Sequence, residues 1–425
     1  MIVGRRTGPW WRRLRSVLPW TLVAGIGCGL EGPSTPGDVP LGWTAPAVYT
    51  LGGADATDWS AFGEVSGVGF DARGWLYVLD GQARRVTVVD TLGERVGTVG
   101  APGEGPGELR FPSDLVVHPD GAVTVLDPGH GGFVVYDRAG AWVRTVPLDA
   151  EDPGMPAGPL RRGADGRLYA AAEPRSDGAP PETPPARVPV VGFSDRDGGG
   201  ARVVAAAWRP PQPETGGLDP AATGGLRVRL PPVLGFHPEV LVAPLPDGRV
   251  AVVDSFAYRV RLVGPGDLPD TVLSRPGSPA PVTRELREAE RERRLAEVAR
   301  EPGRRVVSNA EGEVAAAPDD AVLRLERARI EAMGFHDLVP VLARLGADPQ
   351  GRLWVQRTGV IPWTPGPVDV FTAGDGYLGT LAPGALPVPD AFGPMGLAAW
   401  IGTDAMGAAT VRVGRIRDGD GPPSP

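Results

Sequence analysis

One ten-residue pattern recurs five times along this chain: a four-residue turn that ends in glycine, followed by six residues of mostly apolar strand. The copies are DARGWLYVLD (71–80), HPDGAVTVLD (118–127), GADGRLYAAA (163–172), LPDGRVAVVD (245–254) and DPQGRLWVQR (348–357). Glycine reaches the positive φ that tight corners between strands require, so each copy predicts a turn leading into a β-strand. The turn glycines are Gly74, Gly121, Gly166, Gly248 and Gly351. The first two intervals between them are about 46 residues, and the longer ones indicate the same unit with insertions.

Further apolar runs complete each unit as a four-stranded antiparallel meander. We expect third strands at 86–90, 133–137, 190–194, 260–263 and 368–371, and outer strands at 95–99, 142–146, 202–206, 270–273 and 377–381. A weaker sixth unit is expected at 397–401 and 410–416, completed by an early strand at 48–51. Four strands per period predict a six-bladed β-propeller over 47–417. Strands from both ends of the chain would close the ring and remove exposed sheet edges.

A helical insertion, at about 283–335, is predicted between the fourth and fifth blades. Residues 283–300 are rich in Glu and Arg; Thr283 can cap this helix, and Glu290 lies four residues before Arg294. A second helix is expected at 320–333, with Leu323, Ile330 and Met333 on one face. Dense mixed charge favours a solvated helix packed on the rim; a lid or a ridge for docking a partner remains the alternative.

The pattern Gly-x-Leu-Tyr-Val-x-Asp, a short loop and Arg-Val-x-Val-x-Asp-x-x-Gly occupies 74–93 and, with changes, 121–140 and 248–263. It resembles the blades of NHL-type six-bladed β-propellers. The link GEGPGEL at 103–109, followed by Pro112, resembles the inter-blade signature of bacterial six-bladed propeller lipoproteins. The resemblance covers 47–417 and implies the fold, but it leaves the function open.

The N-terminal segment predicts export. Residues 1–27 combine a basic stretch with an apolar run too short to span a bilayer, which is typical of a signal peptide. Cys28, the only cysteine, follows this run and resembles the lipid attachment site of bacterial lipoproteins; an ordinary signal with an incidental cysteine is the alternative. Residues 28–46 would then be a tether, and 418–425 a disordered tail. We expect a membrane-anchored lipoprotein that faces the periplasm or the cell exterior.

Charge and composition exclude some classes of function. All 43 basic residues are arginine, so lysine chemistry is excluded. Without the predicted leader the net charge is roughly −13, and no basic stripe is visible, which argues against a nucleic-acid partner.

Three aspartates share one position, the end of the second strand of a blade: Asp80, Asp127 and Asp254. They predict either a ring of carboxylates at a mouth of the channel, able to hold a cation, or structural braces. Arginines five residues further on, Arg85 and Arg259, would pair with Asp80 and Asp254, and this favours the brace. In blade five the position is held by Arg357. His130, on the loop PGHGG at 128–132, is a further candidate for the channel mouth.

No motif for catalysis or for a cofactor is visible. Gluconolactonase-type propellers, enzymes on a similar fold, hold a metal with carboxylates and asparagines, and Asn309 is the only asparagine here. The four histidines do not have zinc-site spacing, and no Gly-x-Ser-x-Gly elbow occurs. We therefore expect no metal, no cofactor and no catalytic residue that a motif would reveal.

These observations favour a non-catalytic binding or scaffold module on the cell envelope, with a protein, peptide or glycan as ligand. The alternative is an extracytoplasmic hydrolase or lyase, with its acid and base residues brought from separate blades to the channel mouth. A purely structural envelope protein is the third possibility.

Overall fold

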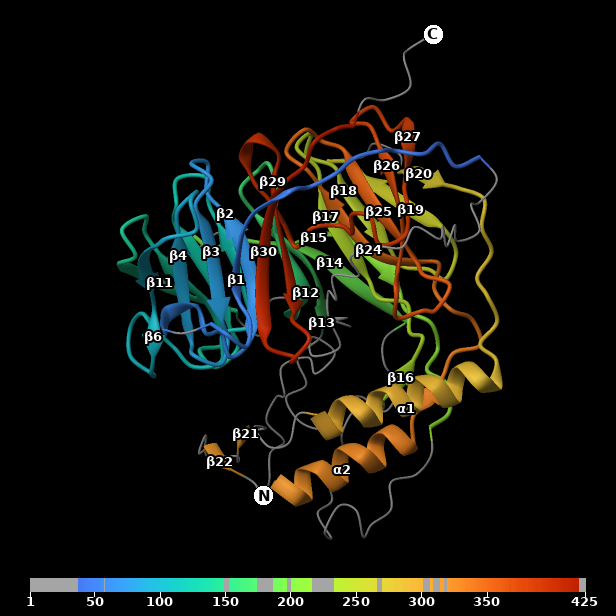
Figure 1. Ribbon diagram of the computed structural model, residues 1–425, viewed down its shortest axis with the longest axis horizontal. Coiled ribbons are helices and arrows are strands. Elements are labelled where there is room, and N and C mark those ends of the chain that lie inside the picture. The colour runs from blue at the N-terminus through green and yellow to red at the C-terminus, as the bar shows by residue number, and fades with distance from the viewer. Residues whose placement is uncertain are drawn as a thin grey trace.

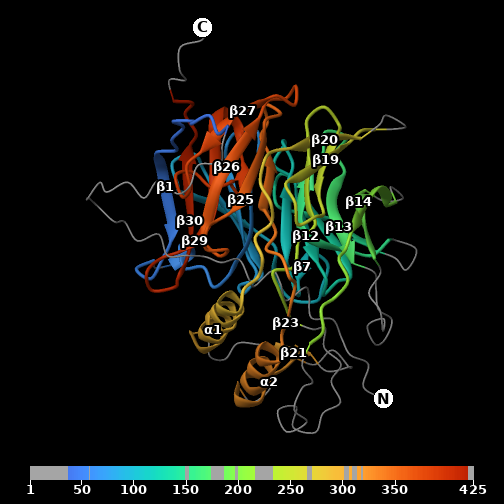
Figure 2. The ribbon, with the colours of Figure 1, turned by 90° about the vertical axis from the view of Figure 1, so that its right-hand side faces the viewer.

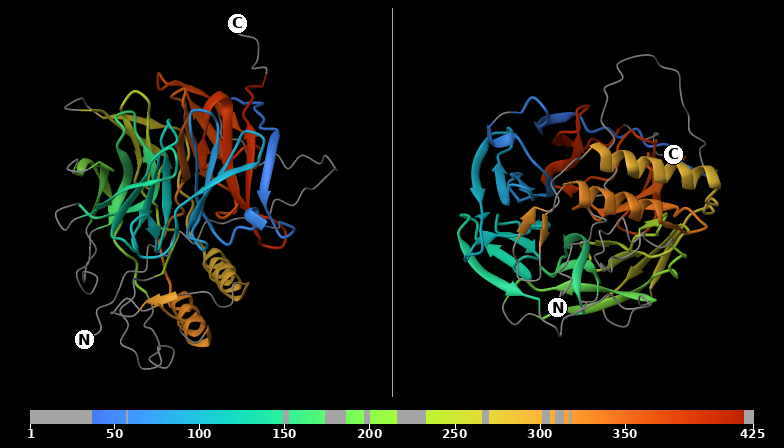
Figure 3. Two further views of the ribbon diagram at one scale, coloured as in Figure 1. Left: turned by 90° about the vertical axis from the view of Figure 1, so that its left-hand side faces the viewer. Right: turned by 90° about the horizontal axis from the view of Figure 1, so that it is seen from below.

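A computed structural model describes residues 37–56, 58–148, 153–173, 186–196, 200–215, 233–265, 270–300, 306–308, 314–316 and 319–419. Six four-stranded antiparallel sheets form a ring, as Figure 1 and the view from below in Figure 3 show. The first strands of successive blades contact one another around the axis. The predicted six-bladed β-propeller is therefore confirmed.

The strands of each blade follow one another from the axis outward. Blade one is β2 (Val65–Phe70), β3 (Leu76–Asp80), β4 (Arg85–Val89) and β5 (Arg95–Val99); blade two is β8 (Asp114–Val117), β9 (Val123–Asp127), β10 (Gly132–Tyr136) and β11 (Trp142–Pro147). Blade three is β12 (Met155–Arg162), β13 (Leu168–Glu173), β14 (Arg187–Phe193) and β15 (Arg202–Trp208); blade four is β17 (Leu241–Pro244), β18 (Val250–Val253), β19 (Arg259–Val263) and β20 (Thr271–Ser274). Blade five is β24 (Leu342–Ala347), β25 (Leu353–Thr358), β26 (Pro365–Phe371) and β27 (Tyr377–Leu381).

Blade six joins the two ends of the fold. Its inner strands are β28 (Ala391–Phe392), β29 (Leu397–Thr403) and β30 (Ala409–Arg415), and its outermost strand is β1 (Ala47–Gly52). β1 pairs antiparallel with β30, with Leu51 opposite Val411. The predicted closure by the early strand is correct.

All five turn glycines have positive φ, from +79° at Gly351 to +93° at Gly121, as the repeat predicts. The second strands are buried over most of their length, and β3 over all of it. They are apolar on both faces because each blade packs against a neighbour on either side.

The apolar core is divided between the blades. Six buried clusters each join residues of two adjacent blades; for example, Val78 of blade one packs in one cluster with Ala399 and Val411 of blade six. Apolar side chains are thus buried between every pair of neighbouring blades, and this burial stabilises the closed ring.

Residues 37–46, part of the predicted tether, form a strap on the outside of the ring. Pro40 bridges Thr380 of β27, and Thr44 bridges Arg417. Trp43 is buried against Trp354, with 5.4 Å between the ring centroids. The predicted signal peptide, Cys28 and the rest of the tether lie outside the described residues, as do residues 420–425 of the predicted tail.

The helical insertion lies below the ring, beneath one face (Figures 2 and 3). It contains α1 (Arg284–Arg300), β21 (Val306–Ser308), β22 (Val314–Ala316) and α2 (Asp319–Glu331). Thr283 Oγ1 accepts the N–H of Leu286, as expected of the cap. A small cluster contains Val298, Ile330 and Met333, with Leu323 against it, so the predicted apolar residues pack together. The helix is shorter than the predicted 320–333, because α2 ends at Glu331 and Met333 follows it.

A parallel two-stranded pair connects the insertion to the ring: β16 (Leu234–Gly235) with β23 (Gly334–Phe335). Two further short pieces, β6 (Ala101–Pro102) and β7 (Glu108–Leu109), pair within the glycine-rich link between blades one and two. In the part of the chain that the structure describes, no helix has both the length and the apolar character needed to cross a bilayer.

Candidate functional site

Asp80 is buried and braces the backbone of its own blade. Its carboxylate accepts the N–H groups of Gly63 and Glu64, which lead into β2, at 3.0 and 3.2 Å. It also accepts the N–H groups of the following turn, at residues 82 and 83. Arg85 lies opposite Asp80 on β4 but forms no ion pair with it, and its Nε is buried without a hydrogen-bond partner among the described residues. The predicted Asp80–Arg85 pair is wrong, because the turn brings backbone donors closer to the carboxylate than the guanidinium.

Asp127 has the same role in blade two. It accepts the N–H groups of Arg110 and Phe111 at 2.7 and 2.8 Å, and it lies 2.9 Å from Nδ1 of His130. Nε2 of His130 faces the carbonyl oxygen of Glu104 at 3.4 Å. Both ring nitrogens of His130 therefore face groups of the protein, on the loop between the second and third strands.

Asp254 joins blade four to blade three. It accepts the N–H of Trp208 at 2.8 Å and a guanidinium N–H of Arg261 at 3.0 Å. The predicted partner, Arg259, is exposed. That pairing is wrong by two residues: Arg261 is within reach of the carboxylate, whereas Arg259 at the start of β19 faces solvent.

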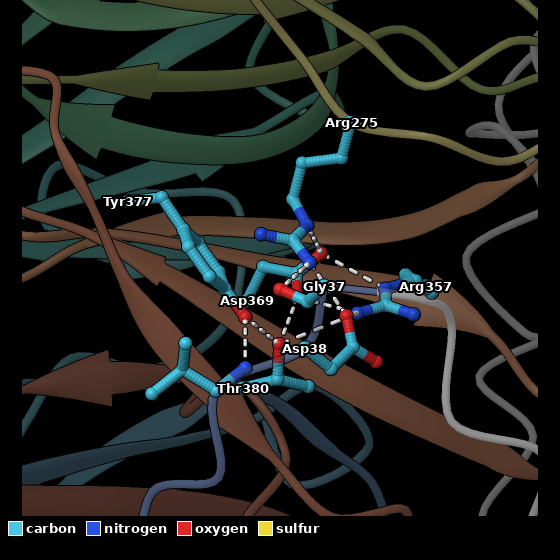
Figure 4. A network of polar contacts seen from close by, with 8 residues as sticks. Gly37, Asp38, Arg275, Arg357, Asp369, Tyr377 and Thr380 are labelled. Carbon is cyan, nitrogen blue, oxygen red and sulfur yellow. Dashed lines mark hydrogen bonds and ion pairs between the residues drawn. The ribbon is translucent and has the colours of Figure 1, made fainter.

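Arg357 lies in a buried network at the strap (Figure 4). Its guanidinium donates to both carboxylate oxygens of Asp369, at 2.9 and 2.6 Å, and to Asp38 of the strap at 2.7 Å. Burial lowers the pKa of Arg357, but the two carboxylates outweigh it and raise that pKa above its ordinary value. Arg275 also binds Asp38, at 2.5 Å, and stacks on Tyr377. The network attaches the strap to blades four and five.

Of the seven predicted residues, all of which the structure describes, Asp127 and His130 contact each other, and the seven do not form one cluster. They lie on different blades, and most of their polar atoms already bind the surrounding protein. Among the residues that the structure describes, no three His, Cys, Asp or Glu side chains converge as ligands for a metal ion.

A histidine pair that sequence analysis missed lies where the insertion meets the ring, directly after the paired strands β16 and β23. Nδ1 of His237 lies 3.1 Å from Nε2 of His336, and the ring of Phe256 from blade four packs on His336. Burial, then the neighbouring His336 and Arg209, lower the pKa of His237 to about 4. Burial also lowers the pKa of His336, against an opposing effect of Asp337. One signal could have revealed this pair: the tripeptide Gly-Phe-His occurs at 235–237 and again at 334–336.

Beside this pair lies a cavity of about 570 Å³ between α1, β23 and the segment that follows blade three. It is lined by Pro213, Glu214, Arg284, Arg287, Glu288, Arg291, Met333, Gly334, Phe335 and Asp337. The three arginines recur every three or four residues, so α1 presents them on one face. The guanidinium carbons of Arg287 and Arg291 lie 5.9 and 5.4 Å from the ring centroid of Phe335. The sequence predicted the helix, but the cavity depends on segments distant in the chain.

No protein-family model matches the sequence, and no curated protein matches it either. Solved structures with a similar arrangement include the calcium-binding protein regucalcin of Agrobacterium tumefaciens, at 13% identity and a TM-score of 0.39 over 86% of this chain and 95% of that one. Virginiamycin B lyase of Staphylococcus aureus has 11% identity and a TM-score of 0.37, over 88% and 99% of the two chains. A gluconolactonase of Xanthomonas campestris has 14% identity and a TM-score of 0.38, over 87% and 98%. We take no function from these similarities.

Proposed function

We propose that this chain is an exported, lipid-anchored β-propeller that binds a protein, peptide or glycan on the face carrying the helical insertion. One observation supports the proposal most directly: the cavity at α1 combines the apolar residues Met333 and Phe335 with two arginines, Arg287 and Arg291, whose Nε atoms have no hydrogen-bond partner among the described residues. Concave sites with an apolar surface and a few polar groups are where proteins commonly bind ligands.

The strap gives the anchored molecule an orientation. Its first described residues run along the side of the ring opposite α1 and α2 (Figure 1). Cys28 lies outside the described residues and only nine positions before Gly37, a distance that extended chain spans in about 31 Å. A lipid on Cys28 would hold the strap side near the membrane and turn the insertion away from it.

A hydrolase or lyase at the channel mouth has less support. The carboxylates expected there, Asp80 and Asp127, accept several hydrogen bonds from the backbone of their own blades. A catalytic acid or base needs a free position next to the substrate.

Two experiments test this proposal. Mass spectrometry of the protein from its native membrane is expected to show diacyl or triacyl modification at Cys28, and Cys28→Ser is expected to release the protein into the soluble fraction. An unmodified Cys28 would contradict the anchor.

For binding, the membrane-extracted wild type and the double variant Arg287→Glu/Arg291→Glu are compared as bait, with Arg324→Glu on the exposed side of α2 as the matched control. We expect a component of defined stoichiometry that the wild type and the control retain and the double variant loses. Identical sets retained by all three would contradict binding at the insertion.

A further inference from the structure

Two glycines, Gly235 and Gly334, allow neighbouring segments to pack closely at the floor of the cavity. A Cβ at Gly235 would collide with the ring of Phe335, and one at Gly334 would collide with the carbonyl oxygen of Glu214. Phe335 therefore lies against β16 with the buried Met333 beside it in the cavity. The floor provides an apolar surface for one aromatic or aliphatic group.

The wall of the cavity contains two arginines, Arg287 and Arg291, that lack a close carboxylate partner among the described residues. Among the described residues Arg291 has no carboxylate partner, and Arg287 reaches only Asp337, at 3.5 Å, whose side chain is 95% exposed. Within the same part of the chain, Nε of both arginines is buried without a hydrogen-bond partner. Arg284, by contrast, is paired with Glu288 at 2.8 Å on the surface. The Arg287 side chain is 42% exposed, so an anion in the cavity can reach the outer nitrogens of its guanidinium group.

The rim limits which anion fits. Glu214, Glu288 and Asp337 also line the cavity, so their three negative charges balance the positive charges of its three arginines. A dianion such as a phosphate monoester would be repelled by the three carboxylates, whereas a single carboxylate fits the planar fork of an arginine.

On the basis of the proposed function, we propose that this cavity binds a carboxylate joined to an apolar or aromatic group. The carboxylate is held by Arg287 and Arg291, and the apolar group packs on Phe335 and Met333. The apolar C-terminal residue of a peptide and a free aromatic acid share this chemistry.

The test uses two matched pairs of probes and isothermal titration calorimetry on the full chain. N-acetyl-phenylalanine is compared with its amide, and N-acetyl-Gly-Gly-Gly-Phe with its C-terminal amide. We expect each acid to bind at least about tenfold more tightly than its amide, since the amide lacks the charge-assisted contact. Tighter binding of the tetrapeptide than of the single residue identifies a peptide end as the ligand, and equal binding identifies a free acid.

Single substitutions of the two arginines test whether the probes bind in this cavity. Arg287→Gln and Arg291→Gln are each expected to weaken the acid about tenfold and to leave the amide unchanged, whereas Arg324→Gln leaves both unchanged. The comparison of acid with amide on the wild type needs no variant, so a folding defect cannot obscure it. Equal affinities for acid and amide, or no binding of either, would overturn this inference. The bait experiment tests the proposed function independently of these titrations. If the wild type retains a component that the Arg287→Glu/Arg291→Glu variant loses, the proposed function stands even when the carboxylate probes fail to bind. If all baits retain identical sets, the proposed function is contradicted.

Discussion

Asp38 and Arg357, which are 319 positions apart in the chain, are joined by a hydrogen bond of 2.7 Å. Asp38 belongs to the strap, and Arg357 lies at the end of β25 in blade five. The side chain of Asp38 is only 11% exposed, and that of Arg357 10%. A segment expected to be a free tether is therefore attached to the ring where it leaves the propeller.

Replacing Asp38 tests how firmly this strap is held. Asp38→Asn removes the charge that faces both Arg275 and Arg357, and we expect it to lower the free energy of unfolding by about 2 kcal/mol, since a partly buried cation loses its partner. Chemical denaturation followed by circular dichroism measures this. The exposed Asp55→Asn is the control, and equal stability of the two variants would contradict an energetic role for the strap.

The same pair predicts a dependence on pH. Burial acts to raise the pKa of Asp38, but hydrogen bonds and charge from Arg357 and Arg275 outweigh it, so the pKa falls below its ordinary value of 3.8. A carboxylate with a depressed folded pKa stabilises the fold above pH 3.8, and this contribution is lost as the pH falls through the lowered value. Denaturation curves of the wild type and Asp38→Asn are thus expected to converge in strong acid. A constant difference at all pH values would count against this assignment.

Asp80 tests whether the shared aspartates are braces. In Asp80→Asn an amide group replaces one carboxylate oxygen and faces backbone donors that then lack an acceptor. We expect the free energy of unfolding to fall by about 1–3 kcal/mol, measured by denaturation. Asp120→Asn, in an exposed turn, is the control. If these aspartates held a cation instead, added calcium would raise the unfolding temperature of the wild type; we expect no change.

The repeat glycines predict a cost that depends on backbone conformation alone. Gly248 has a φ of +89°, and no neighbouring atom lies within 4 Å of the position that a Cβ would occupy. Gly248→Ala is therefore expected to lower the free energy of unfolding by about 1 kcal/mol through φ strain. Gly97→Ala, equally uncrowded but at ordinary φ, is expected to have no such effect. Thermal and chemical denaturation compare the two, and an equal loss would contradict the assignment of the turn.

The histidine pair predicts loss of stability in mild acid. The pKa of His237 falls from 6.5 to about 4 on folding, and that of His336 is also lowered. The unfolded chain then binds more protons, so stability decreases as the pH falls from about 6.5 toward 4, by roughly 3 kcal/mol for His237. Unfolding free energies between pH 7 and 5 are expected to decline less steeply in His237→Gln/His336→Gln. Parallel curves for the wild type and the variant would show that the pair does not carry this effect.

Much of the fold could be predicted because its signals are local. A glycine that must adopt positive φ, as at Gly74, and the alternation within a strand are encoded within ten residues. The cap at Thr283 and the pair of Glu290 with Arg294, now seen at 2.5 Å, follow from helix geometry in the same way. The prediction that Arg259 pairs with Asp254 is wrong, and Arg261 is the partner instead. Spacing along a strand does not specify which arginine side chain lies close to the carboxylate.

The number of blades, the closure of the ring and the position of the helical insertion could all be predicted from the period of the repeats along the chain. The contacts of His237 with His336, of Asp38 with Arg357, and of Arg287 and Arg291 with the ring of Phe335 depend on three-dimensional packing. The first two contacts join residues that are about a hundred positions or more apart in the chain. The third joins two sides of the cavity. Their physical basis is the packing of the insertion and the strap on the ring, which no local pattern encodes.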